Sequence, residues 1–124
     1  KKSMNQILTI PGELPSMNKV IGANRQNRHL GAKVKKQATE AVYWYAYEQL
    51  KPMDEPVDVV ITWYCKDKRQ DKDNISSAIK FILDGVVDAG KLQGDGWKHI
   101  GDISHKFKVD KENPRIEVIF EEVA

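Results

Sequence analysis

Four short segments of the chain carry the apolar patterns that are typical of β-strands. The segment VDVVITWYC, residues 57–65, is dense in β-branched and aromatic residues and predicts a largely buried strand. The segment QILTI, residues 6–10, predicts a short strand that ends at a proline and a glycine. Residues 103–109 and 116–120 alternate apolar and polar positions on either side of the turn sequence ENPR, and this pair predicts a β-hairpin.

Two longer segments have the three- and four-residue apolar spacing of amphipathic helices. The first helix is expected from about His29 to Leu50. The second is expected to begin after Asp73, where isoleucine, leucine and valine form one stripe, and to end near Gly90. The polar stretch between Gly12 and Gly31 predicts a long surface loop.

This order of elements predicts an α/β (α+β) fold in a single domain that spans residues 1–124. The order is β-α-β-α-β-β, which corresponds to a small mixed sheet with two main helices packed on it. A chain of 124 residues is long enough for one hydrophobic core and too short for two comfortable ones.

Composition excludes several classes of protein. Hydrophobic residues make up 40% and charged residues 31% of the chain, and no apolar run approaches the roughly 20 residues of a membrane helix. The apolar stretch near the N-terminus is far too short for a signal peptide, so we expect a cytoplasmic protein with no membrane partner. The single cysteine, Cys65, can form no internal disulfide or cysteine zinc cage, and its apolar surroundings predict a structural thiol.

The net charge of only +2 does not indicate a nucleic-acid-binding protein, but the distribution of the charge is one-sided. Between Lys19 and Lys36 the chain carries six cations and no acid, and this pattern is expected of a phosphate-binding surface. A solvated basic loop and helix face would have the same pattern. The six cations are Lys19, Arg25, Arg28, Lys33, Lys35 and Lys36.

Asp71 and Asp73 lie between the predicted buried strand and the second helix, in the sequence KRQDKDN. If the backbone is extended there, the two carboxylates project to the same side and repel each other unless a cation balances them. Mg²⁺ prefers such hard oxygen ligands, and Asp95, flanked by glycines, could supply a third. Two alternatives need no metal: Asp73 could be the N-cap of the helix, and Asp71 could pair with Lys68, Arg69 or Lys72.

The second predicted helix carries one lysine that could assist such a site. On a continuous helix Asp73, Lys80 and Asp84 share an exposed ridge, and Lys80 lies roughly 10 Å along the axis from Asp73, from where it could reach a bound phosphate. A surface ion pair between Lys80 and Asp84 is the alternative.

Other catalytic and cofactor sites have no support in the sequence. The three histidines, His29, His99 and His105, are scattered without metal-ligand spacing, and we assign them no role. No glycine-rich phosphate loop of P-loop or Rossmann form is present, so no nucleotide cofactor is expected.

Taken together, these segments resemble the RusA family of Holliday junction resolvases, small metal-dependent endonucleases often carried by phages and prophages. The resemblance runs over most of the chain, from LPSMNKVIGANR through the basic helix and the hydrophobic strand to RQDKDNISSAIKFILDGVVDAG and LQGDGWKHI. Its most specific part is the D-x-D-N motif, followed by a helix that contains I-L-D-G and by a D-G-W-K loop.

The resemblance implies that Asp71, Asp73 and Asp95 are catalytic carboxylates that bind Mg²⁺, for which Mn²⁺ is a plausible substitute. It also implies a catalytic lysine. Ser77 stands where relatives often have that lysine, and Lys80 is the expected equivalent. We expect Asn74 and Asp84 to support the site. Where many relatives have another acid before the last aspartate, this chain has Gly94.

The resemblance further implies that the substrate is branched DNA and that the protein is a homodimer. Paired nicks in a four-way junction need two sites related by a two-fold axis. The residues expected to hold the DNA backbone are Lys33, Lys35, Lys36, Arg25, Arg28 and Arg69. Two other functions stay open: a nuclease for flaps, forks or other branched DNA, and a non-catalytic DNA-binding module in which Asp71 and Asp73 are a structural loop and a helix cap.

Overall fold

Four strands form one mixed sheet in the order β1-β4-β2-β3 in the computed structural model, which describes residues 5–123. Strand β4 is antiparallel to both β1 and β2, and β3 is parallel to β2. The basic start of the chain and the last residue of the expected 1–124 domain lie outside the described range. The strands are β1 (Asn5–Pro11), β2 (Val57–Cys65), β3 (Ile100–Val109) and β4 (Arg115–Glu122).

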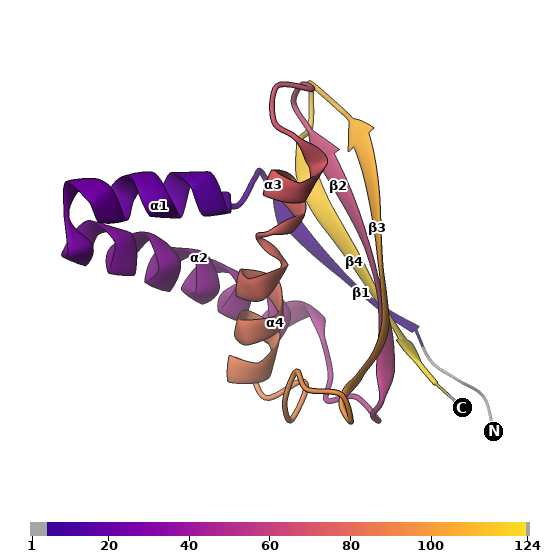
Figure 1. Cartoon of the computed structure of the whole chain (residues 1–124). Coiled ribbons are helices and arrows are strands. Elements are labelled where there is room, and N and C mark those ends of the chain that lie inside the picture. The colour runs from indigo at the N-terminus through magenta and orange to yellow at the C-terminus, as the bar shows by residue number, and fades with distance from the viewer. Residues whose placement is uncertain (1–4, 124) are drawn as a thin grey trace.

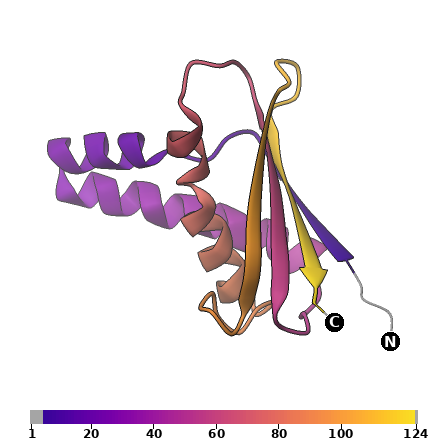
Figure 2. The same ribbon diagram turned by 45° about the vertical axis from the view of Figure 1, so that its right-hand side comes forward.

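All the helices lie on one side of this sheet (Figure 1). Helix α4 and the second half of α2 lie against the sheet, whereas α1 and the first half of α2 project as a two-helix arm (Figures 1 and 2). The helices are α1 (Met17–Gln26), α2 (Arg28–Gln49), α3 (Lys72–Ser76) and α4 (Ile79–Asp88). None of the helices in residues 5–123 has the length and apolar character needed to cross a bilayer.

The mixed α/β fold class is confirmed, and so are its central elements. The strand predicted over residues 57–65 has these bounds in the structure, and the first predicted helix corresponds to α2 within one residue at each end. Each of these two segments buries one side in the core. In β2 the buried positions alternate from Val57 to Trp63.

The long surface loop predicted between Gly12 and Gly31 is wrong, because most of this stretch forms α1 and the start of α2. Ser16 caps α1 by accepting a hydrogen bond from the Lys19 N–H at 3.3 Å. One residue, Asn27, separates the two helices. Its N–H donates to the Ala23 carbonyl at the end of α1, and its side chain accepts from the His29 N–H at the start of α2. Packing against α2 stabilises α1, which has only ten residues and would be marginal as an isolated helix.

The predicted hairpin of residues 103–109 and 116–120 is also wrong, because β2 lies between β3 and β4. Both β2 and β4 have one fully buried side, so they take the centre of the sheet. Strand β3 exposes most of its side chains and carries two lysines, a composition that suits an edge. Burial therefore outweighs the tendency of consecutive strands to pair.

The second predicted helix is divided into α3 and α4 at Ser77 and Ala78. The Ser77 hydroxyl donates to the Asn74 carbonyl at 2.5 Å and accepts from the Met17 N–H at 3.0 Å. Because Ser77 is used in this contact with the start of α1, Asp73 and Lys80 do not lie on one continuous helix. The ridge expected from a helical wheel is not formed.

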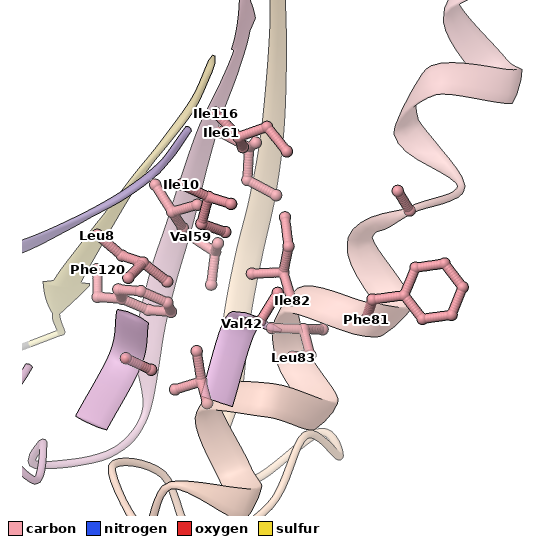
Figure 3. Packing of buried hydrophobic residues seen from close by; sticks show 14 of the residues in the cluster. Leu8, Ile10, Val42, Val59, Ile61, Phe81, Ile82, Leu83, Ile116 and Phe120 are labelled. Atoms are coloured by element: carbon pink, nitrogen blue, oxygen red, sulfur yellow. The ribbon is translucent and has the colours of Figure 1, made fainter. Parts of the chain in front are cut away.

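The core lies between the sheet and the pair α2 and α4 (Figure 3). Ile82 of α4 and Val42 of α2 are fully buried there, together with the side of β2 that faces the helices. The two helices approach so closely at Gly85 that a Cβ atom there would lie 2.6 Å from the Cβ of Val42. The glycine of the I-L-D-G motif therefore permits the helix contact.

Candidate metal and nucleic-acid site

The loop after β2 places Asp71 and Asp73 at the start of α3. Asp71 occupies the N-cap position with extended backbone angles, but its side chain makes no capping hydrogen bond. Asp73 lies in the first turn, and its Oδ1 accepts from the Asn74 N–H at 2.9 Å. The alternative in which Asp73 is the N-cap is therefore wrong, and the carboxylate of Asp71 is not used to cap the helix.

Both aspartates line one open hollow of about 880 Å³. Three lysines share it, Lys68 and Lys72 from the same loop and helix and Lys108 from β3. Lys108 reaches the hollow because β3 pairs with β2 in parallel, with Lys108 opposite Tyr64. The sequence did not indicate Lys108, because the expected hairpin pairs residues 103–109 with 116–120 and not with β2.

Within residues 5–123 neither Asp71 nor Asp73 forms a salt bridge with a lysine, arginine or histidine. The alternative in which Asp71 pairs with Lys68, Arg69 or Lys72 finds no such contact in that range. Arg69 instead lies 3.7 Å from the carboxylate of Asp67. The two neighbouring carboxylates thus line one hollow without a salt-bridge partner in that range, and both are available as oxygen ligands.

The two aspartates offer oxygen ligands of the kind that a hard divalent cation such as Mg²⁺ prefers. This ion is usually held by one or two carboxylates, with water and substrate phosphate completing its shell. The part of the chain that the structure describes contains no group of three or more histidine, cysteine, aspartate or glutamate side chains placed to hold a metal. One chain therefore does not bring Asp95 together with Asp71 and Asp73.

Asp95 belongs to a second charged cluster, on α4. The Lys80 ammonium lies 3.0 Å from Asp84 and 3.5 Å from Asp95. The hydrogen bond to Asp84 and the negative charges of both aspartates raise the pKa of Lys80, so this lysine stays charged. The alternative in which Lys80 pairs with Asp84 is confirmed, and Lys80 contacts these acids and does not line the hollow of Asp71 and Asp73.

The loop that carries Asp95 is fastened to the connection before β2. The Glu55 carboxylate accepts from the Gln93 N–H at 2.6 Å and lies 2.5 Å from the His99 Nδ1. Burial alone would raise the pKa of Glu55, but these two hydrogen bonds and nearby positive charge lower it. His99, to which the sequence assigned no role, therefore helps to fix the shape of the loop around Asp95.

Asn74, the last residue of the D-x-D-N motif, connects the site to the arm. Its Oδ1 accepts from the Asn18 N–H at 3.3 Å, and its Nδ2 donates to Gln70 at 2.8 Å. Together with Ser77, it binds the first amides of α1. The expected supporting role of Asn74 thus has a physical form, because it holds the arm against the loop of Asp71 and Asp73.

The cations expected to bind DNA lie on the arm and on the nearby loop. Arg25 lies in the last turn of α1, and Arg69 lies in the loop before Asp71. On α2 the expected cations are Arg28, Lys33, Lys35 and Lys36, and all six side chains are exposed.

A second hollow of about 600 Å³ lies between the arm and the loop, lined among others by Lys19, Lys66 and Gln70. Gln70 also lines the hollow of the two aspartates, so the two hollows adjoin at this residue.

Cys65 lies beside these hollows and is partly buried. Burial, and then the nearby charges of Glu13 and Asp67, raise the pKa of its thiol. A thiol held in its neutral form is a poor nucleophile, as expected of a structural cysteine.

No family model matches the chain, and a search of curated proteins finds no match. The resemblance to the RusA family therefore rests on the motifs and their spacing.

Proposed function

We propose that this protein is a Mg²⁺-dependent, structure-selective endodeoxyribonuclease that resolves Holliday junctions by paired symmetric nicks. The observation that carries the proposal is the pair Asp71 and Asp73, which face one hollow without a salt-bridge partner in residues 5–123 and lie among lysines. A structural loop would use its carboxylates internally, whereas a nuclease site leaves them free for a metal. The D-x-D-N motif supports the proposal further, through its resemblance to the RusA family.

The chain's own residues divide the work at this site. A bound divalent ion supplies a polarised phosphate and an activated water for in-line attack on the phosphodiester. Asp71 and Asp73 would supply the oxygen ligands, and Lys68 and Lys72, which line the same hollow, would attract the phosphate. Asn74 holds α3 in place through its bonds to Gln70 and Asn18.

Asp95 and Lys80 have a different part in this proposal. The contact between Lys80 and Asp95 holds their charges on the exposed side of α4. Within one chain, these two side chains lie apart from Asp71 and Asp73. Their roles as third carboxylate and catalytic lysine stay predictions of the family resemblance.

The arm supplies the sequence-independent affinity for DNA. Its cations are exposed and, within residues 5–123, without acidic partners, so they are available to phosphates. A four-way junction has approximate two-fold symmetry, and a homodimer would cut its opposing strands with two equivalent sites.

The experiment that tests the function is incubation with a labelled mobile four-way junction, with Mg²⁺ and with EDTA. We expect symmetric incisions on opposing arms with Mg²⁺ and none with EDTA. A flap and a linear duplex are compared in parallel, because preferential cleavage of the flap would identify the related branched-DNA nuclease instead. Junction binding without cleavage of any of these substrates would favour the non-catalytic module.

The substitution Asp73→Asn separates the metal role from a structural one. Asparagine keeps an oxygen that accepts from the Asn74 N–H, so the free energy of unfolding is expected to change by less than about 0.5 kcal/mol. Loss of a ligand charge is expected to lower the cleavage rate by about 100-fold or more, with junction binding retained. Cleavage is measured in single turnover and stability by denaturant titration.

The matched control is Asp88→Asn, which removes an exposed carboxylate from the end of α4. It is expected to cleave at the rate of the unmodified protein. If Asp73→Asn cleaves as fast as this control, Asp73 is not a metal ligand.

A further inference from the structure

The two edge strands of the sheet, β1 and β3, differ in how far the rest of the chain covers them. At the β1 edge the Gln49 amide pairs with the Thr9 backbone, accepting from its N–H at 2.7 Å and donating to its carbonyl at 2.9 Å. Gln6 exchanges a similar pair of bonds with the backbone of Lys51, at 2.8 and 3.2 Å. The end of α2 therefore closes the β1 edge.

Strand β3, on the side of the sheet away from the arm in Figure 1, has no such cover. Within residues 5–123 the one side-chain hydrogen bond to its backbone runs from the Asp102 N–H to Asp58 of the neighbouring β2. The strand is ten residues long, so a row of N–H and C=O groups faces outward. An open edge of this length is a template for another strand.

The side chains of β3 are self-complementary about His105. In an antiparallel pair of two β3 strands centred on this residue, Asp102 lies opposite Lys108 of the second copy, and this ion pair occurs twice. On the other side Ile103, 43% exposed in one chain, lies opposite Phe107 of the second copy. Centring the pair on Lys106 would instead set Lys106 against Lys106 and Asp102 against Asp110.

We propose that β3 is the dimer interface: it pairs with β3 of a second copy, antiparallel and centred on His105, to form a continuous eight-stranded sheet. The complementary charges and apolar groups favour a second copy of this chain over an unrelated strand. The interface follows from the sheet topology and the sequence of β3. The proposal specifies which surface joins the two chains of the homodimer in the proposed function, and it does not depend on the nuclease chemistry.

A charge exchange tests the interface and its register by sedimentation equilibrium. The unmodified chain is expected to have twice the 14.2 kDa mass of one chain. Asp102→Lys and Lys108→Asp each set like charges opposite one another, and each is expected to raise the dimer dissociation constant about tenfold or more. The double variant Asp102→Lys/Lys108→Asp restores opposite charges and is expected to restore the dimer.

The matched control is Lys111→Asp, a charge reversal in the turn after β3, which is expected to stay dimeric. Circular dichroism checks that each variant is folded. A monomeric unmodified chain, single variants that dimerise like the control, or a double variant that stays monomeric would each overturn the proposal. None of these measurements involves cleavage, so the result is independent of the nuclease test.

Disulfide trapping gives a second measurement of the register. In a Cys65→Ala background, a chain with Ser104→Cys mixed with a chain with Lys106→Cys is expected to form a cross-linked heterodimer, because these positions lie opposite each other. Each chain alone is expected to cross-link far less. Equal cross-linking of the separate chains and the mixture would exclude the His105-centred pairing.

Discussion

A single histidine shows how a residue that looks like surface in the sequence becomes part of the structure. His105 alternates with lysines along β3, yet its ring is half-buried and accepts a hydrogen bond at Nδ1 from the Trp63 indole at 2.9 Å. The rings of Trp63 and Phe107 lie nearly parallel to that of His105, with centroids 6.0 and 6.2 Å away. No pattern in the sequence indicates this contact, since it depends on the parallel pairing of β2 and β3.

The burial of His105 makes the stability of the protein sensitive to mild acid. Burial lowers the pKa of His105 below its ordinary value of 6.5. The unfolded chain takes up this proton at higher pH than the folded chain, so the free energy of unfolding falls as pH drops through 6.5 toward the lower folded pKa. The substitution His105→Asn, which keeps an acceptor for Trp63, is expected to reduce this fall.

Urea titrations at pH 7.5 and pH 5 measure the effect. His29→Asn serves as the control, because His29 is exposed on the arm, and we expect it to keep the pH dependence of the unmodified protein. If His105→Asn also keeps all of that dependence, His105 does not cause it.

Among the elements, the contact of α2 with α4 depends most closely on one position. At Gly85 an added Cβ atom would lie 2.6 Å from both Cβ and Cγ1 of Val42 and 3.0 Å from the Thr39 carbonyl oxygen. The helices can keep this distance only without a side chain there. Because α4 also carries Lys80 and Asp84, the same contact fixes where the charged cluster of Asp95 lies.

The substitution Gly85→Ala is therefore expected to lower the free energy of unfolding by about 1–3 kcal/mol, the usual cost of overpacking. Gly22→Ala on the exposed side of α1 is the control, because nothing lies within 4 Å of its added Cβ. It is expected to raise stability by about 0.5–1 kcal/mol through its higher helix propensity. Both are measured by denaturant titration, and equal effects of the two would argue against a close helix contact at Gly85.

The elements also show which parts of the fold the sequence can predict. Strand β2 and helix α2 were predicted because each has regularly spaced apolar residues that lie buried in the core. Helix α1 was missed because it buries Val20 and little else, and its start is held by Asn74 and Ser77 from a distant part of the chain. The pairing of β3 with β2 was missed because it depends on how deeply each strand is buried relative to the others. The pattern within a single strand does not show this.

For the candidate site, the sequence predicts the proximity of residues that are close in the chain better than that of distant ones. Asp71 and Asp73 share a hollow as expected, because only Lys72 lies between them in the chain. The position of Asp95 depends on a long loop, whose shape is set by Glu55 and His99. Periodicity does not report such loop contacts, and the three aspartates are not gathered in one chain.

At the scale of the whole molecule, the positive charge is concentrated on the projecting arm. The net charge is only +2, yet the arm carries a run of exposed cations with no acid between Lys19 and Lys36. If the arm binds the DNA backbone, the salt dependence of binding measures the number of phosphates that it neutralises.

The double substitution Lys35→Ala/Lys36→Ala tests this role of the arm. We expect weaker junction binding and a slope of log affinity against log salt that is smaller by about one unit for each phosphate that the variant no longer neutralises. Binding is measured in EDTA, so that no cleavage occurs. The control Lys51→Ala/Lys111→Ala removes two exposed lysines away from the arm, and a slope change as large as that of the arm variant would refute the assignment.

The hydrogen bonds of the Gln49 amide to β1 also limit where further strands can be added to the sheet. A strand can join a sheet wherever an edge is bare, and a subunit with two bare edges can add neighbours indefinitely, as fibrils do. Here the end of α2 occupies one edge, so each chain has a single direction of growth, and growth ends once two such chains have met. The side chain that completes β1 thereby keeps an assembly of these subunits finite.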